Sequence, residues 1–282
     1  MSLPSGYKRL EYIQSSGTQK IDTGFKPNNN TKITADAEYI SSDGTYPALF
    51  GARNGGSQQF WLFWGGSAFI SRYNTSDITV AATLTDRHQF TLNKNVLSID
   101  GSSATGATAT FQSNYNAYLF SVNASGSTSY CCKARLYSCQ IYDNGTLVRD
   151  FIPCQTTAGE IGLWDDVNSV FYENAGTGTF TAGPVVVVIP EAPSNLRQTM
   201  AVRLAWAEVS GAEQYNVYRD GTLLGTTTGL FYVDDTAAEN TEYTYAVSAF
   251  NSAGESAKTT LTVYTKSGYF LYKPYVESAT FQ

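Results

Sequence analysis

Histidine is almost absent from this sequence, with one residue, His88, among 282. His88 lies far from the cysteines, and no CxxC pair occurs, so the ligand spacing of a zinc site is missing. The turn G-x-S-x-G, which presents the nucleophile in many hydrolases, is missing as well. We therefore expect His88 to be an ordinary edge or surface histidine near the start of a strand.

The four cysteines are few and close together in the chain: Cys131, Cys132, Cys139 and Cys154. Adjacent Cys131 and Cys132 point to opposite faces if this segment is a strand. We expect small buried thiols in a sheet. One disulfide, for example between Cys139 and Cys154, is the alternative, because four cysteines allow several pairings and the spacing does not choose among them.

Charged residues are scarce too, at 15%, and the net charge at pH 7 is −6. A nucleic-acid partner needs a basic stripe that displaces phosphate counterions, so none is expected. No apolar run reaches the roughly 18 residues that cross a bilayer, so we expect no membrane insertion. The opening MSLPSGYKRL has no apolar core and does not resemble a secretory signal.

Strand-forming and turn-forming residues fill the rest of the chain. Tyr (20), Phe (15) and Gly (24) are abundant, whereas Met (2) is rare and helix-favouring runs are missing. Aromatic and β-branched side chains suit a pleated sheet, and Gly and Asn suit tight turns. The composition therefore predicts an all-β protein, and 282 residues favour two domains.

The clearest domain boundary is the proline-rich stretch GPVVVVIPEAPSNL. Proline fixes φ and removes a backbone donor, so this stretch is typical of a stiff connector or an edge strand. A flexible linker would be rich in Gly and Ser instead. We predict a first domain over residues 1–183, a linker over 184–192, a second domain over 193–265 and a C-terminal tail over 266–282.

The second domain shows a regular series of short strands. Alternation in VRLAWAEV has the period of a half-buried strand, and YNVYRDGTLLG predicts a hairpin around Asp220-Gly221. Further strands are predicted in TEYTYAVSAFNSAGES and TTLTVYT. The most characteristic positions are Pro193, Trp206, Tyr215, Val217, Tyr243, Asn251, Gly254 and Ser256.

On these residues, the chain resembles a fibronectin type III domain from about residue 191 to residue 265. The resemblance implies a small immunoglobulin-like β-sandwich. It also places Tyr243 at the tyrosine corner, where a hydroxyl ties the chain to nearby backbone. Such domains mostly space and present other domains, so a spacer role is implied.

The first domain is also rich in alternating segments, including KITADAEYI, QFWLFW, HQFTLNKNVLSIDG and NAYLFSV. ARLYSCQIYDNGTLVRDFIPC predicts a hairpin around Asp143-Asn144-Gly145. The opening GYKRLEYIQSSGTQKIDTGFKPNNNT and the closing GEIGLWDDVNSVFYENAGTGTFTAG resemble concanavalin A-like, laminin-G-like jelly-roll domains of bacteriophage tail proteins and gut-bacterial surface proteins. The resemblance implies a large antiparallel jelly-roll sandwich whose first and last strands meet.

Acidic pairs are the next test, because glycoside hydrolases of this fold place two carboxylates on one sheet face. Asp36 and Glu38 in DAEYI share a strand face, but nothing acidic follows at the spacing of E-x-D-x-x-E. One alternating pair more often faces solvent. The sequence therefore predicts a protein that is not an enzyme.

Calcium is the one cofactor that the laminin-G-like resemblance implies, through oxygen ligands at a loop rim. Asp165, Asp166 and Asn168 in LWDDVNSVF could supply such oxygens. The same letters also describe an ordinary Asx-rich turn, which is the favoured interpretation.

The stretch FWLFWGG begins at Phe60 and places large side chains on both faces of one strand. Phe60, Leu62 and Trp64 point one way and are expected in the core, whereas Trp61 and Phe63 point the other way. Two alternatives follow for Trp61 and Phe63. Either another segment, such as the N-terminal strand, packs over them, or they face a ligand.

In the ligand-binding alternative, Trp61 and Phe63 join Tyr73 and Asn74 in a sugar platform. Aromatic rings stack on pyranose faces, and amides bind hydroxyl groups.

These patterns predict a non-enzymatic structural and adhesive protein of a phage virion, such as a tail fibre, baseplate or other appendage. Its lectin-like head would serve host-surface recognition or assembly, and its fibronectin-like module would be the spacer. The expected partners are other virion proteins or copies of itself, and a host-surface glycan. The alternative is a carbohydrate-binding adhesin, at the surface of a gut bacterium or secreted.

The tail KSGYFLYKPYVESATFQ is unusually aromatic for a solvated segment. We predict that it docks on a partner chain or on another copy of the protein. The assembly residues would be Tyr269, Phe270, Leu271, Tyr272 and Tyr275.

Overall fold

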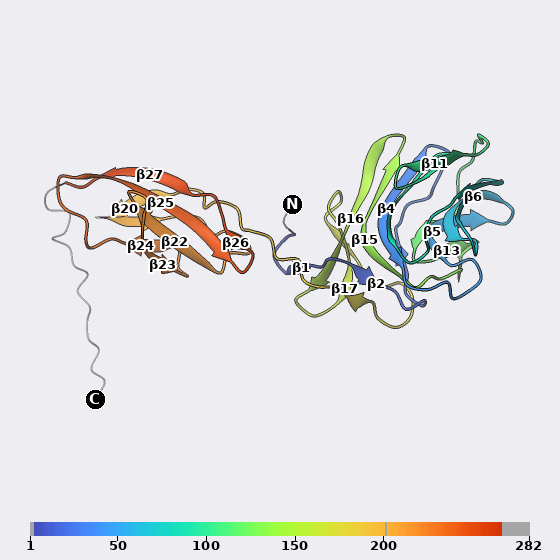
Figure 1. The fold of residues 1–282 in the computed structure, drawn as a ribbon, viewed down its shortest axis with the longest axis horizontal. Coiled ribbons are helices and arrows are strands. Elements are labelled where there is room, and N and C mark those ends of the chain that lie inside the picture. Colours follow the sequence, from blue (N-terminus) through green and yellow to red (C-terminus); the bar gives the residue numbers. More distant parts are fainter. Residues whose placement is uncertain (1–2, 201, 267–282) are drawn as a thin grey trace, which may run out of the picture. The chain divides into compact units, whose positions relative to one another are not determined.

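The computed structural model describes residues 3–200 and 202–266. The chain forms two compact units, Leu3–Val186 and a second that begins at Val187. All regular secondary-structure elements in the described ranges are β-strands, so the all-β prediction is confirmed (Figure 1). For the same residues, no helix is long and apolar enough to cross a membrane. The predicted assembly residues 269–275 lie outside the described part of the chain.

Sheet 1 is the larger sheet of the first unit, with eleven antiparallel strands among the described residues. Its main path runs β11-β10-β9-β4-β15-β16-β17-β18, β1 pairs with β16, and β2 pairs with β15 and β19. The strands are β1 (Tyr7–Arg9), β2 (Ile13–Gln14), β4 (Thr31–Tyr39), β9 (Arg87–Asn93), β10 (Val96–Ile99), β11 (Ser102–Thr105), β15 (Ala134–Asp143), β16 (Thr146–Thr156), β17 (Ile161–Asp165), β18 (Val170–Tyr172) and β19 (Thr181–Ala182).

Sheet 2 is the second sheet of the first unit, with eight strands in the part of the chain that is described. Its path runs β14-β13-β5-β6-β7-β8, and β12 joins β3 to β5; one pair, β13 with β5, is parallel. The strands are β3 (Ile21–Asp22), β5 (Ala48–Asn54), β6 (Ser57–Trp64), β7 (Phe69–Tyr73), β8 (Ser76–Val80), β12 (Tyr118–Leu119), β13 (Val122–Ala124) and β14 (Ser127–Ser129).

The main core of the first unit is formed by inward side chains of both sheets. Ile33 and Ala35 of β4 in sheet 1 belong to one buried cluster with Phe60 and Leu62 of β6 in sheet 2. Each fully buried large apolar side chain contributes about 1.5–3 kcal/mol relative to an exposed one. The two sheets are therefore held face to face as a β-sandwich.

The opening and closing segments of the first unit lie side by side, as the resemblance implied. Ile13 in β2 pairs with Ala182 in β19, and Leu10 forms an isolated bridge with Val185. The hairpin predicted around Asp143-Asn144-Gly145 is also present, because Asp143 pairs with Thr146 across the two-residue turn.

The Pro-bounded segment forms hydrogen bonds with the first unit at its start and with the second unit at Val188. Pro184 accepts a hydrogen bond from the Glu11 amide, and Val186 donates to the Arg9 carbonyl. In the second unit, Asn251 Nδ2 donates to the Val188 carbonyl at 2.8 Å. The segment predicted as a linker therefore makes backbone contacts with each unit.

The second unit contains two further sheets. Sheet 3 has the order β20-β21-β24, and sheet 4 has the order β23-β22-β25-β26, with β27 paired to β25. The strands are β20 (Arg197–Met200), β21 (Arg203–Ala205), β22 (Gln214–Arg219), β23 (Thr222–Thr227), β24 (Phe231–Val233), β25 (Glu242–Asn251), β26 (Gly254–Glu255) and β27 (Thr259–Tyr264).

Two details of the second unit were predicted from the sequence. Arg219 pairs with Thr222, so Asp220-Gly221 forms the two-residue hairpin turn, with both φ values positive. The Tyr243 hydroxyl accepts the Ala238 amide hydrogen at 3.0 Å, which is the predicted tyrosine corner.

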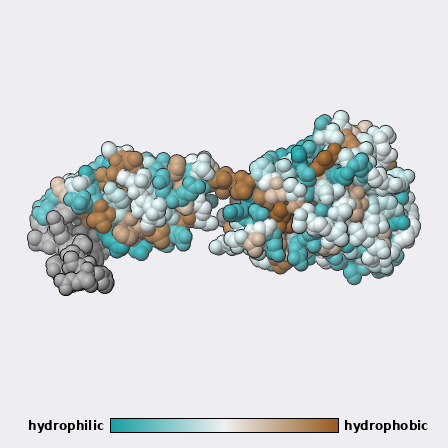
Figure 2. Space-filling view, turned by 90° about the horizontal axis from the view of Figure 1, so that it is seen from below, coloured by the Kyte–Doolittle hydropathy of each residue, from teal (hydrophilic) through white to brown (hydrophobic). Residues whose placement is uncertain are grey.

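The face of the molecule in Figure 2 is mostly polar, although 42% of the residues in the chain are hydrophobic. In this view, white and teal side chains predominate, and the apolar ones form separate patches. Scattered exposed apolar residues are normal for a folded protein.

A buried carboxylate, Asp234, links the two sheets of the second unit. It accepts hydrogen bonds from Tyr245 Oη at 2.6 Å and from the Thr236 amide at 3.0 Å, and it pairs with Arg219 at 2.7 Å. Burial alone would raise the pKa of Asp234, but the hydrogen bonds and the Arg219 charge outweigh burial and lower it.

We predict that Asp234→Asn lowers the unfolding free energy of the second unit by on the order of 3 kcal/mol at pH 7, because it leaves Arg219 without its buried partner. Peptide-resolved hydrogen exchange in β25 would measure this loss. Since the folded pKa is depressed, the stabilisation is present above the unfolded pKa of about 4 and disappears as the pH falls through the folded pKa.

The matched control is Asp235→Asn, which removes the neighbouring, exposed carboxylate. It should leave exchange in β25 unchanged. Equal effects of the two variants would show that the buried carboxylate is not what stabilises the second unit.

Candidate functional site

The outer face of sheet 2 is built from β5, β6 and β7. Trp61 of β6 lies opposite Gly51 of β5 and Arg72 of β7. Side chains on opposite sides of a strand alternate, so the burial of Phe60 and Leu62 in the main core sends Trp61 and Phe63 outwards. The predicted division of FWLFWGG into two faces is thus present.

Trp61 and Phe63 do not lie bare on that face, because they are only 1% and 2% exposed. The Trp61 ring stacks on Phe63 at 4.2 Å and on Tyr130 at 5.1 Å. The Arg72 guanidinium lies 5.5 Å from the Trp61 ring centroid. The covering alternative therefore applies to these two rings, but Tyr130 and Arg72 cover them rather than the N-terminal strand.

Gly51 makes this packing sterically feasible. A Cβ atom at Gly51 would lie 2.0 Å from Trp61 Cβ, and its φ of +152° is rarely adopted by other residues. Only the absence of a side chain at Gly51 lets the β6 backbone at Trp61 come this close to β5.

A pocket of about 340 Å³ opens above the stacked rings, and we call it the aromatic pocket. This volume lies within the range of small-ligand sites. Aromatic and apolar side chains form its base, and two arginines and one aspartate add polar groups. The lining residues are Tyr46, Arg53, Trp61, Phe63, Gly65, Ile70, Arg72, Asp77 and Tyr130.

Two tyrosines of the aromatic pocket are held in an uncommon backbone conformation. Tyr46 has a φ of 55° and Tyr130 a φ of 58°, values that bulky residues rarely adopt. Tyr130 is anchored by a hydrogen bond from the Ala48 amide to its carbonyl at 2.8 Å, and Tyr46 is 50% exposed. Such strain persists where the surroundings fix it, and it is frequent at ligand sites.

The polar groups of the aromatic pocket are also fixed in place. Arg72 is bound to Asp77 by two parallel hydrogen bonds, and this pairing raises the pKa of Arg72. Arg53 Nη1 donates to the Tyr130 hydroxyl at 3.1 Å. The aromatic pocket therefore combines the half-exposed Tyr46 ring with oriented donors and acceptors, the combination that suits a sugar.

Tyr73 and Asn74 are not part of this pocket, which corrects the predicted platform. Tyr73 lies opposite Phe60, so it shares the inward face, is 3% exposed and packs in the main core. The Asn74 side chain accepts the Gln58 amide hydrogen at 3.0 Å and fastens the turn between β7 and β8. Both residues are structural.

The three residues considered as calcium ligands form an Asx-rich turn, which was the favoured interpretation. Asp165 is fully buried; its Oδ1 accepts the Asp150 and Val167 amide hydrogens, and its Oδ2 accepts from Asn168 Nδ2 at 2.7 Å. Asp166 donates its amide hydrogen to the Asp150 carbonyl. The Asp165 oxygens already accept hydrogen bonds, and Asn168 points its amide nitrogen at them, so these residues do not fit a cation.

The acidic pair on β4 is neutralised by arginines. Asp36 forms two hydrogen bonds with Arg87 at 2.7 Å, and Glu38 pairs with Arg135 at 3.2 Å. A general acid must be free to exchange its proton with substrate, whereas the oxygens of both carboxylates already accept hydrogen bonds from guanidinium groups. The pair fits a structural role better than a catalytic one.

His88 is buried rather than on the surface, which corrects that prediction. Its Nδ1 lies 2.5 Å from Asp100 and its Nε2 lies 2.7 Å from the Thr83 carbonyl. The imidazole also packs edge-on against Phe69 and Phe90. Both nitrogens are thus occupied by structural partners.

All four cysteines are free thiols, so the Cys139–Cys154 disulfide is not formed. Cys132, Cys139 and Cys154 are buried, and Cys131 is half-buried, close to the buried thiols that we predicted. Burial raises the pKa of Cys154 to about 12, and the pKa of Cys139 is raised further.

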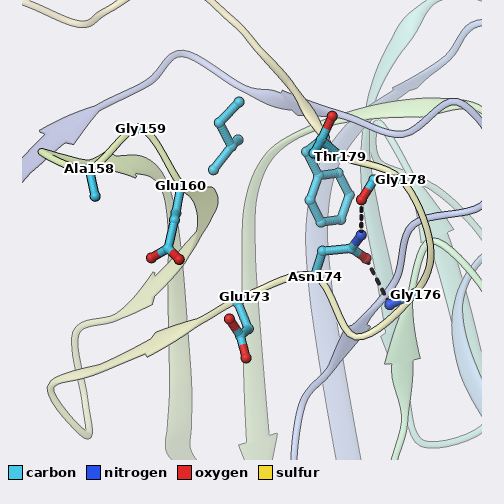
Figure 3. Close-up of a pocket in the computed structure, with 10 residues that line it drawn as sticks. Ala158, Gly159, Glu160, Glu173, Asn174, Gly176, Gly178 and Thr179 are labelled. Carbon is cyan, nitrogen blue, oxygen red and sulfur yellow. Dashed lines mark hydrogen bonds between the residues drawn. The ribbon is translucent and has the colours of Figure 1, made fainter.

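A second hollow, of about 480 Å³, lies between the turn at 158–161 and the loop at 173–180. Figure 3 shows two glutamates, Glu160 and Glu173, on its wall, and Asn174, which closes the loop by accepting the Gly176 amide hydrogen. Both carboxylates are exposed, and neither forms an ion pair with any described residue. Exposed acids alone do not define a site, so the aromatic pocket is the stronger candidate.

Comparisons with known proteins find partial similarity. No protein-family model matches the chain. It is 38% identical over 87 residues to a poly(3-hydroxybutyrate) depolymerase of Ralstonia pickettii. This match covers 29% of this chain and 16% of that enzyme. It is 33% identical over 84 residues to chitinase C of Streptomyces lividans. This match covers 28% of this chain and 13% of the chitinase. The chain therefore spans less than a fifth of either relative.

Solved structures with some likeness are FN3tt, the fibronectin(III)-like modules of CbhA from Clostridium thermocellum, and a tripod from the baseplate of bacteriophage Tuc2009. FN3tt is 28% identical, with a TM-score of 0.26, and the match covers 29% of this chain and 99% of FN3tt. CbhA is 9% identical, with a TM-score of 0.24, covering 64% and 85%. The tripod is 11% identical, with a TM-score of 0.18, covering 93% and 82%. At these scores the likenesses carry no argument of their own.

We predict that Gly51→Ala disturbs the aromatic pocket, because the new methyl group would overlap Trp61. Near-UV circular dichroism from the stacked rings should weaken, and the unfolding free energy of the first unit should fall by about 3 kcal/mol. Urea denaturation measures the second effect. Gly56→Ala is the control, since nothing lies within 4 Å of its added Cβ atom; indistinguishable variants would contradict the packing described here.

Proposed function

We propose that this chain is a non-enzymatic structural and recognition protein. Its first unit would bind a glycan in the aromatic pocket, and its second unit would act as a spacer. The single observation that carries the proposal is the aromatic pocket itself, in which Tyr46 and Tyr130 are held in strained backbone conformations over stacked rings.

The arrangement of the carboxylates supports a protein without hydrolytic activity. A glycosidase needs two carboxyl groups about 5–10 Å apart and free to act on one bond. The acids on β4 are each held by an arginine, and Asp77 of the aromatic pocket is held by Arg72. The enzymes among the relatives match less than a third of this chain, which fits a shared accessory module.

We assign the protein to a phage virion appendage on the resemblance of its first domain, with a lectin-like jelly-roll head for attachment to the host. The alternative is an adhesin at the surface of a gut bacterium, or secreted from it. The proposed pocket would serve both, because each must recognise a surface glycan.

Replacement of Tyr46 by alanine tests glycan binding directly. Tyr46 is half exposed, so Tyr46→Ala should leave the melting temperature unchanged while weakening binding about tenfold, through loss of one stacking surface. A glycan array followed by calorimetry on the bound sugars would measure this. Tyr264→Ala is the matched control, since Tyr264 is 52% exposed in the second unit. Equal affinities for the two variants would refute the assigned pocket.

The aromatic C-terminal segment is proposed as the assembly element. We predict a defined oligomer for the full chain and a monomer for residues 1–265, as measured by light scattering. The truncation keeps Thr265, because its hydroxyl donates to the Thr241 carbonyl and its burial closes the end of the second unit. An oligomer that survives truncation, or a monomeric full chain, would rule out this role.

A further inference from the structure

The local charge of the aromatic pocket opposes that of the whole chain. Its two guanidinium groups, Arg53 and Arg72, and its one carboxylate, Asp77, leave one positive charge. The chain as a whole carries −6. A positive site on an acidic protein attracts anionic ligands locally, over a distance of about 10 Å at moderate ionic strength.

The excess charge belongs to Arg53 rather than Arg72. Both Asp77 oxygens are bound by Arg72, so that pair is neutral as a unit. Among the ion pairs of the described residues, none includes Arg53. Within the described ranges, its one hydrogen bond to a side chain goes to a neutral group, the Tyr130 hydroxyl.

The Arg53 guanidinium is also oriented in advance. It lies 5.5 Å from the centroid of the Tyr130 ring and donates through Nη1 to the hydroxyl of that residue. Tyr130 is in turn fixed by its backbone hydrogen bond and by stacking on Trp61. A planar guanidinium with donors to spare suits two-pronged binding of a carboxylate or sulfate group.

The Tyr130 hydroxyl adds a neutral donor beside this cation. Because its oxygen accepts the Arg53 N–H, its own hydrogen is directed elsewhere and can reach a ligand hydroxyl or ring oxygen. The exposed Tyr46 ring supplies an apolar surface at the same rim.

We propose that the aromatic pocket selects acidic sugars, and that Arg53 determines this specificity by pairing with the anionic group of the glycan. The inference rests on the proposed glycan-binding function and adds the chemical class of the ligand. The shared chemistry is an anionic group on a pyranose ring, whether a uronic acid carboxylate or a sulfate ester.

The test compares matched oligosaccharides on the full-length protein by calorimetry: galacturonic acid oligomers, their methyl esters, neutral galactose oligomers and galactose 6-sulfate oligomers. We expect the wild-type chain to bind one acidic set at least tenfold more tightly than the neutral set, and the preference to shrink as salt is added. The acidic set that binds more tightly shows whether the pocket recognises a carboxylate or a sulfate group.

Arg53→Gln should abolish the preference for acidic sugars, because it removes the one positive charge of the aromatic pocket that is unpaired among the described residues. Arg9→Gln is the matched control, because it removes the same charge from β1 in sheet 1 and should leave the preference intact. If Arg53→Gln fails to fold, Tyr130→Phe loosens the guanidinium while keeping the ring, and it should reduce the same preference.

Three outcomes would overturn the inference, and they differ in whether they also refute the proposed glycan-binding function. Equal binding of acidic and neutral sugars refutes the specificity but leaves the glycan-binding function in place. An acid preference that survives in Arg53→Gln and in Tyr130→Phe refutes the role of Arg53. A wild-type chain that binds no sugar on the array refutes the function and the inference together.

Discussion

The structure of the first unit depends on the alternation of side chains along β6. Phe60 and Leu62 are needed to hold the two sheets together, since burial of each large side chain contributes about 1.5–3 kcal/mol. Their inward direction forces Trp61 and Phe63 outwards, where two large rings would otherwise face water. Tyr130 and Arg72 cover them so that both rings are buried, and these covering side chains also line the aromatic pocket.

Much of this fold follows from local sequence patterns. The two hairpins with Asn-Gly and Asp-Gly turns occur where predicted, because these residues tolerate positive φ and set the pairing of the flanking strands. The two faces of β6 follow equally directly from the period of a strand, and the tyrosine corner at Tyr243 was implied by the fibronectin type III resemblance. In each case the decisive interaction lies within a few residues along the chain.

The site was harder to predict because it depends on pairing between distant segments. Tyr73 was predicted beside Trp61 and Phe63, but its pairing with Phe60 directs its side chain into the core. The pairing register of β6 and β7 depends on the conformation of the loop between them, which the sequence does not reveal. Arg53 comes from β5, and Tyr46 and Tyr130 come from loops. No local sequence signal marks a tyrosine that will adopt positive φ, so the pocket appears only in three dimensions.

The free cysteines have a consequence for where the protein can exist. The chain is held together by apolar packing and backbone pairing, and its thiols are kept protonated by burial. Its stability should therefore be nearly independent of the redox potential of its surroundings.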